Sequence, residues 1–256
     1  MKRKKIFLIG ILSIALLFSC NNDDNNSTNG SLTIEFDNVV SMSEDLTLNV
    51  DAFTNSSDET INISELKYII SNIVLIDENG GEFVYPKADS YRVVNELDNA
   101  SRTITLNNIP YRNYTQVRFG LGVDPTQYPL DQLQNFIPQA EETDMLWAWA
   151  AGYKFIKFEG NYTPNGGTEA PFIYHVGSHG TNQDNYKVVT LNLPGTARVD
   201  AETTPFVHIM AMIPQVFDGT TTIDLSSADN VQVDPVNAPI ISTNFSNIFM
   251  AHHVEN

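Results

Sequence analysis

Hydrophobic residues alternate with polar ones through much of the chain, and this period of two constrains the fold more than any other feature. The alternation runs through residues 32–36, 103–106 and 116–121. Successive side chains of a strand point to opposite faces, so each segment predicts a strand with one buried face. About ten such strands over roughly 220 residues are typical of one sandwich. We therefore expect an all-β fold, an antiparallel β-sandwich of the Greek-key or immunoglobulin-like type.

Other patterns refine this expectation. Residues 66–76 are apolar on both faces, which predicts a central strand, and the Asn-Gly pair at 79–80 predicts a hairpin turn behind it. A strand that starts at residue 186 is expected to end at the Pro-Gly pair at 194–195. Helical spacing is confined to residues 130–133 and 245–249, so one or two short helices are expected.

Domain organisation follows from the lack of an internal repeat and of an interior linker rich in Pro, Gly or Ser. We expect residues 31–256 to form a single domain. Two small sandwiches in series are the alternative.

Composition excludes several classes of function. The formal net charge is −17 and the sequence pI is near 4.4, so the chain lacks the positive charge with which proteins bind nucleic acids. A single Cys excludes an internal disulfide and a Cys-based zinc site. The five His are the remaining candidates for metal ligands.

The N-terminus has the organisation of a secretory signal. Four of residues 1–5 are basic, and residues 6–18 are uncharged and apolar, a run too short to span a bilayer as a mature helix. The segment ends in Leu-Phe-Ser-Cys, which resembles the lipobox of bacterial lipoproteins. Residues 1–19 are therefore expected to be a lipoprotein signal peptide and Cys20 the lipidated residue, an ordinary signal peptide being the alternative. The polar residues 20–30 are expected to form a disordered tether.

All five His lie in the last third of the chain. His175 and His208 each lie within an apolar segment, His179 lies between glycine-rich residues, and His252 and His253 lie near the C-terminus. Imidazoles on neighbouring strands would form a metal site suited to zinc or copper. The alternative is that each His forms ordinary hydrogen bonds in the core or at the surface.

Both Trp of the chain lie close together, in the segment 145–156. If this segment is a strand, Trp147 and Trp149 share one face. They would then either fill the core or form an exposed binding platform.

Several segments together resemble the MbnP family of copper-binding proteins, in particular its lipoprotein members in Bacteroidetes. The resemblance rests on the order and spacing of residues 66–73, 145–155, 172–177, 205–210 and 253–256. It implies a β-sandwich that holds copper through His beside a Trp oxidised to kynurenine. It also implies a dihaem peroxidase of the MauG type as the partner for that oxidation, and an outer-membrane copper importer as a further partner.

Carried over to this chain, the resemblance implies that His175, His208 and His253 bind copper, as Cu(I) or Cu(II), and that Trp147 or Trp149 is oxidised. Many relatives end in Asp-His-Val-His-Asn, whereas this chain has Glu255 in place of the final His. A carboxylate ligand there would weaken a preference for Cu(I).

These interpretations lead to an expected function. We expect a lipid-anchored protein of the outer membrane, on its periplasmic or cell-surface face, that captures or handles copper. It is not expected to be an enzyme, because the chain has no Gly-x-Ser-x-Gly elbow, no phosphate-binding loop and no His-Glu-x-x-His motif. The alternatives are a surface module that binds glycan or protein through Trp147 and Trp149, and a structural sandwich without a ligand.

Overall fold

The computed structural model describes residues 28–127, 136–147, 152–178 and 183–256. Several predicted features lie outside these residues: the signal peptide, Cys20, most of the tether, the predicted helix near residues 130–133, Trp149 and His179. In the described part of the chain, no helix has the length and apolar composition needed to cross a membrane.

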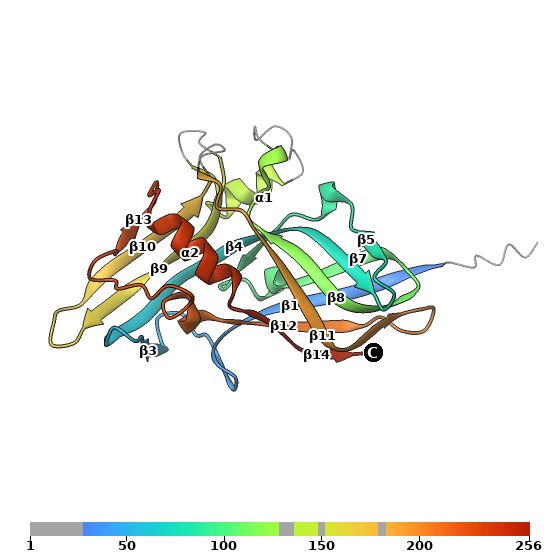
Figure 1. Ribbon diagram of the computed structural model, residues 1–256, viewed down its shortest axis with the longest axis horizontal. Coiled ribbons are helices and arrows are strands. Elements are labelled where there is room, and N and C mark those ends of the chain that lie inside the picture. The colour runs from blue at the N-terminus through green and yellow to red at the C-terminus, as the bar shows by residue number, and fades with distance from the viewer. Residues whose placement is uncertain (1–27, 128–135, 148–151, 179–182) are drawn as a thin grey trace, which may run out of the picture.

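Within the described residues the fold is mostly β, with two sheets of mixed strand direction and two α-helices (Figure 1). The smaller sheet has five strands: β14 (Phe249–Glu255), β12 (Phe206–Met212), β1 (Asn29–Ser41) and, both along the free side of β1, β2 (Glu44–Asp45) and β7 (Thr103–Pro110).

The larger sheet has nine strands and is organised around the long strand β4. Its main path is β11 (Lys187–Val199), β8 (Arg112–Leu121), β4 (Glu59–Asp77), β9 (Lys154–Pro164), β10 (Ala170–Gly177) and β13 (Asn230–Val231); the short strands β3 (Ala52–Thr54), β5 (Glu82–Val84) and β6 (Arg92–Asn95) also pair with β4. The helices are α1 (Ile137–Glu142) and α2 (Asn237–Ser246), and short 3₁₀ turns span Lys87–Asp89, Asn99–Arg102, Pro125–Gln127 and Ile213–Val216.

The predictions of a β-rich fold, a central strand and a hairpin are confirmed. The apolar segment 66–76 lies within β4, and Gly80, with φ of +80°, forms the turn between β4 and β5. This positive φ explains the glycine, which has no Cβ to disfavour it. The Greek-key arrangement and the single-domain boundary remain predictions.

Two details differ from the sequence-based expectations. The sheets are not antiparallel throughout, because β1 pairs with β12, and β10 with β13, in parallel. The strands β1 and β12 come from opposite ends of the chain, so no hairpin determines their relative direction. The strand β11 also continues past Pro194 and Gly195, which lie within a bulge between Asn192 and Ala197 opposite β8. A bulge accommodates proline because it leaves backbone groups out of the ladder.

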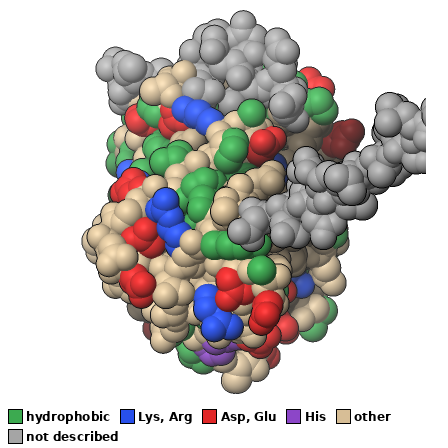
Figure 2. Space-filling model, turned by 90° about the vertical axis from the view of Figure 1, so that its right-hand side faces the viewer, with side chains coloured by type: hydrophobic (Ala, Val, Ile, Leu, Met, Phe, Trp, Pro, Cys, Tyr) green, Lys and Arg blue, Asp and Glu red, His purple; other side chains and the backbone are tan. Residues whose placement is uncertain are grey.

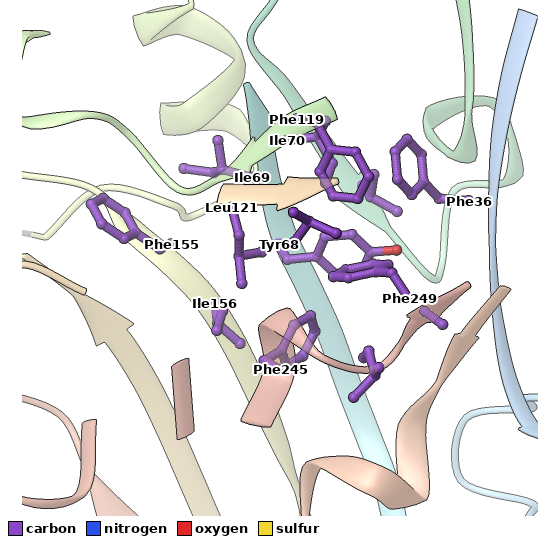
Figure 3. Close-up of a cluster of buried hydrophobic side chains, with 14 of the residues drawn as sticks. Phe36, Tyr68, Ile69, Ile70, Phe119, Leu121, Phe155, Ile156, Phe245 and Phe249 are labelled. Atoms are coloured by element: carbon purple, nitrogen blue, oxygen red, sulfur yellow. The ribbon is translucent and has the colours of Figure 1, made fainter. Parts of the chain in front are cut away.

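Aromatic side chains from both sheets meet in one core (Figure 3). Phe36 of β1 makes edge-to-face contacts with Phe119 of β8 and Phe249 of β14, at ring-centroid distances of 5.3 and 6.2 Å. Tyr68 of β4 contacts Phe245 of α2 at 5.3 Å. Edge-to-face pairs add to the stabilisation from apolar burial. This core fixes the smaller sheet, and with it β12 and β14, against the larger one.

Replacement of Phe36 should test the contribution of this core. Phe36 is fully buried, so Phe36→Ala is expected to lower the free energy of unfolding by about 3–5 kcal/mol through lost contacts and a cavity. Chemical denaturation measures the change. Val84→Ala, at a side chain that is 64% exposed, is the control and should change the free energy of unfolding by no more than about 0.5 kcal/mol. Equal effects of the two variants would contradict the assignment of Phe36 to the core.

Candidate metal centre

Three histidines meet where β12 pairs with β14. The register of this antiparallel pair places His208 opposite His253 and Ile209 opposite Ala251, so His252 is an extra residue in β14. Such a bulge sets two residues of one strand against a single residue of its partner. It therefore allows the adjacent residues His252 and His253 both to face His208, which a regular strand with alternating side chains would not.

The three imidazoles are close enough to share one metal ion. One ring nitrogen of each His lies within 4.8 Å of the corresponding atoms of the other two. His208 Nδ1 is 3.3 Å from His252 Nδ1, which is 2.8 Å from His253 Nδ1. Bonds of ~2.0–2.1 Å to a tetrahedral ion separate two nitrogens by about 3.4 Å. The donor set therefore fits a metal ion after small side-chain movements.

The site is at the surface but not fully exposed. The His208 side chain is 12% exposed and that of His253 is 40% exposed. Figure 2 shows histidine side chains on one face of the molecule, beside acidic and basic ones. An ion from solution can reach such a site without any opening of the core.

Carboxylates surround His208 on the side away from the other imidazoles. Its Nε2 lies 3.3 Å from Asp37 Oδ2 and 3.6 Å from Glu35 Oε2, both on the neighbouring strand β1. A carboxylate at Nε2 favours the tautomer with the proton on that nitrogen, which leaves the Nδ1 lone pair for a metal. His253 also has a carboxylate near its Nε2 atom, since this atom lies 3.5 Å from Glu255 Oε1.

Asp37 is held in a partly buried position. Burial raises the pKa of its carboxyl group, as does the charge of Asp45, while His208 and Arg102 oppose this effect. The Arg102 guanidinium is 3.4 Å from Asp37 and also 3.4 Å from Glu96. Arg102 thus fixes the carboxylate that orients His208.

The end of β14 is fixed by the side chain of Asn256. Its Oδ1 accepts a hydrogen bond of 2.7 Å from the backbone N–H of Arg198, and its Nδ2 donates one of 2.8 Å to the carbonyl of Thr196. Both partners belong to β11 of the larger sheet, and Figure 1 shows the C-terminus beside this strand. This link holds the strand that carries His252 and His253.

The structure brings together two of the three predicted ligands and places the third elsewhere. His208 and His253 belong to the cluster, whereas His175 lies on β10 of the larger sheet, with its Nε2 2.7 Å from Glu159 Oε1. His252 was not predicted as a ligand. The doublet His252-His253 was its only sequence signal, because the bulge depends on the register with β12.

Trp147 lies beside His175 rather than beside the cluster. The two rings are 5.9 Å apart in an edge-to-face arrangement, and the Lys154 ammonium is 5.6 Å from the centre of the indole. Burial disfavours ionisation of the neighbouring Asp144, but hydrogen bonds from Lys157 and Lys154 outweigh it and lower the pKa of Asp144 to about 2.

The described residues on either side of positions 148–151 pair with each other in antiparallel fashion, through a bridge between Leu146 and Tyr153. The backbone N–H of Trp147 donates to the Gly152 carbonyl, and β9 begins only at Lys154. A face shared by Trp147 and Trp149 depends on residues outside the described part of the chain.

Comparison with known proteins now adds the family. A model of the MbnP family matches residues 29–237. The chain belongs to the MbnP family. Among solved structures, MbnP from Methylosinus trichosporium is similar, with 14% sequence identity and a TM-score of 0.47, and the alignment covers 80% of this chain and 81% of that one. No curated protein matches the sequence. The region matched by the MbnP model includes His175 and His208, whereas His252 and His253 follow it.

Removal of the carboxylate at His208 should weaken metal binding. Asp37→Ala is expected to lower the affinity of the cluster for Zn²⁺ by about 10–100-fold, because the imidazole loses the partner that orients it. Asp37→Asn keeps an oxygen that can accept from Nε2–H, so it should lose less. Titration with a chromophoric chelator as competitor measures both affinities.

Glu44→Ala is the matched control, because it removes the same charge from an exposed residue of the same sheet. It should leave the affinity within about twofold if long-range charge effects are screened. An equal loss in Glu44→Ala and Asp37→Ala would contradict a positioning role for Asp37.

Proposed function

We propose that this member of the MbnP family is a lipid-anchored copper-binding protein that captures or hands over copper outside the inner membrane. The observation that carries this proposal is the cluster of His208, His252 and His253. Imidazole binds zinc, copper and nickel, and among divalent ions copper binds most tightly to a given set of nitrogen ligands. Family membership supports copper as the cargo.

The chemistry of the site suits binding rather than turnover. Three imidazoles would hold the ion, and its remaining coordination positions would face solvent, where a partner can supply a competing ligand. The carboxylates of Glu35 and Asp37 orient His208 and add negative charge that attracts a cation. No step of a catalysed reaction is required of these residues.

The set His175, His208 and His253, inferred from the sequence, is the competing ligand assignment. In the structure His175 lies on the other sheet, outside the cluster of the three neighbouring imidazoles. We therefore favour His252 over His175 as the third imidazole.

The proposal also includes the modification and partners expected of the family. Trp147 or Trp149 would be oxidised to kynurenine by a dihaem peroxidase of the MauG type, and an outer-membrane importer would take up the copper. Because the ring of Trp147 contacts that of His175, such a modification at Trp147 would change the surroundings of His175.

The alternative of a glycan- or protein-binding platform receives no support from Trp147. Its side chain is 5% exposed, and an aromatic platform requires exposed rings. Trp149 lies outside the described residues.

Alanine variants should distinguish the two ligand sets. His208→Ala and His252→Ala are each expected to lose stoichiometric copper, because two imidazoles hold the ion less tightly than three. His175→Ala is the matched control and should keep its copper. Copper content after dialysis against a competing chelator measures the outcome. Loss in His175→Ala with retention in His252→Ala would favour the set His175, His208 and His253, and failure of the wild-type protein to bind copper would refute the proposed function.

Peptide mass spectrometry of protein from the envelope fraction should test the anchor and the modification. The peptide that begins at Cys20 is expected to carry acyl chains, and Cys20→Ala should leave the protein soluble. The peptide containing Trp147 and Trp149 should carry the mass of a kynurenine when the peroxidase is co-expressed. An unmodified N-terminus would refute the lipid anchor, and unmodified Trp beside full copper loading would remove kynurenine from the proposal.

A further inference from the structure

Met210 and Met250 face each other next to the histidine cluster, and Met210 follows His208 by two residues in β12. The register of β12 and β14 pairs Met210 directly with Met250, next to the bulge that sets His208 against His252 and His253. Residues directly opposite in an antiparallel pair have Cβ atoms ≈ 4.5–5.5 Å apart. The two thioethers are therefore neighbours.

The methionines share the outer face of the smaller sheet with the histidines. The flanking pairs, Ile209 with Ala251 and Ala211 with Phe249, belong to the opposite, inner face, where Ile209, Ala211 and Phe249 enter the shared core. Side chains alternate along a strand, so Met210 and Met250 point outward, as does His208 two residues before Met210.

Burial of Met210 is unusual for this outer face. Met210 is 4% exposed, yet it is not among the described residues that form the shared core. On β1 its partner in the parallel register is Asp37. Met250 is 39% exposed. One methionine is thus sheltered and the other accessible from solution.

Thioether sulfur next to imidazole has a particular metal preference. Sulfur ligands of this soft kind select Cu(I), whereas Zn²⁺ and Cu(II) are well served by imidazole alone.

We propose that Met210 and Met250 form a soft-metal subsite that binds Cu(I) beside the histidine cluster and makes the centre selective for Cu(I). This inference rests on the proposed function and names the oxidation state and two further ligands. The exposed Met250 would meet the ion first, and Met210 would hold it next to His208.

The double variant Met210→Leu, Met250→Leu tests the subsite. Leucine conserves the volume of methionine, so the fold should be kept. The probes are Ag(I), as an analogue of Cu(I) that does not change oxidation state, and Cu(I) kept reduced by ascorbate. We expect affinity for both to fall by at least about 10-fold, because the loss of two sulfur ligands should cost no less than the loss of an outer-shell partner does. Affinity for Zn²⁺ should stay unchanged, because the imidazoles remain.

Met42→Leu is the control, since Met42 is 52% exposed and outside β12 and β14. X-ray absorption of the Cu(I)-loaded protein gives an independent readout: a sulfur scatterer is expected in the wild-type protein and should be absent in the double variant. Unchanged Ag(I) and Cu(I) affinities, or an equal loss for Zn²⁺, would overturn the subsite.

Different results would contradict this inference and the proposed function. Copper binding that depends on His208 and His252 but not on the methionines would refute the subsite alone. A wild-type protein that binds no copper would refute the function, and its Ag(I) titration would still decide whether the two sulfurs bind a soft ion.

Discussion

The position of β12 between β1 and β14 is the constraint on which the centre depends. From β1 comes the carboxylate of Asp37 at His208 Nε2, and from β14 come His252 and His253. Both pairings must have the correct register, because a shift by one residue would turn His208 toward the core. Packing on the inner face of the same sheet stabilises that register, because Phe36 of β1 and Phe249 of β14 make edge-to-face contacts with Phe119 of the larger sheet.

Electrostatics and hydrogen bonding then complete the centre. Acidic side chains at Glu35, Asp37 and Glu255 adjoin the imidazoles, so the surroundings favour cations over anions. The same carboxylates occupy the Nε2 atoms of His208 and His253, which leaves the Nδ1 atoms facing one another. The arrangement therefore places three imidazole nitrogens beside a negatively charged rim, which favours a cation at this position over an anion.

The sequence predicted the fold where local pattern decides structure. Alternation in residues 32–36 and the apolar run 66–76 identified β1 and β4. The burial of a strand on one face or on both can be recognised from the polarity of consecutive residues. Prediction from the sequence failed where pairing between distant segments determines the structure. The parallel pairing of β1 with β12 and the continuation of β11 through Pro194 depend on partners far along the chain. His252 was missed for the same reason, whereas His208 and His253 were found from residue type and family resemblance.

The bulge in β14 has a further consequence for the stability of the sheet edge. An ion held by His208, His252 and His253 would cross-link the outermost strand to its neighbour, and by mass action it would stabilise their docking by about 2.7 kcal/mol at a free concentration 100 times its dissociation constant. The coupling is reciprocal. Any contact that separates β14 from β12 would therefore weaken the binding of the ion, and a bound ion would oppose that separation to the same extent.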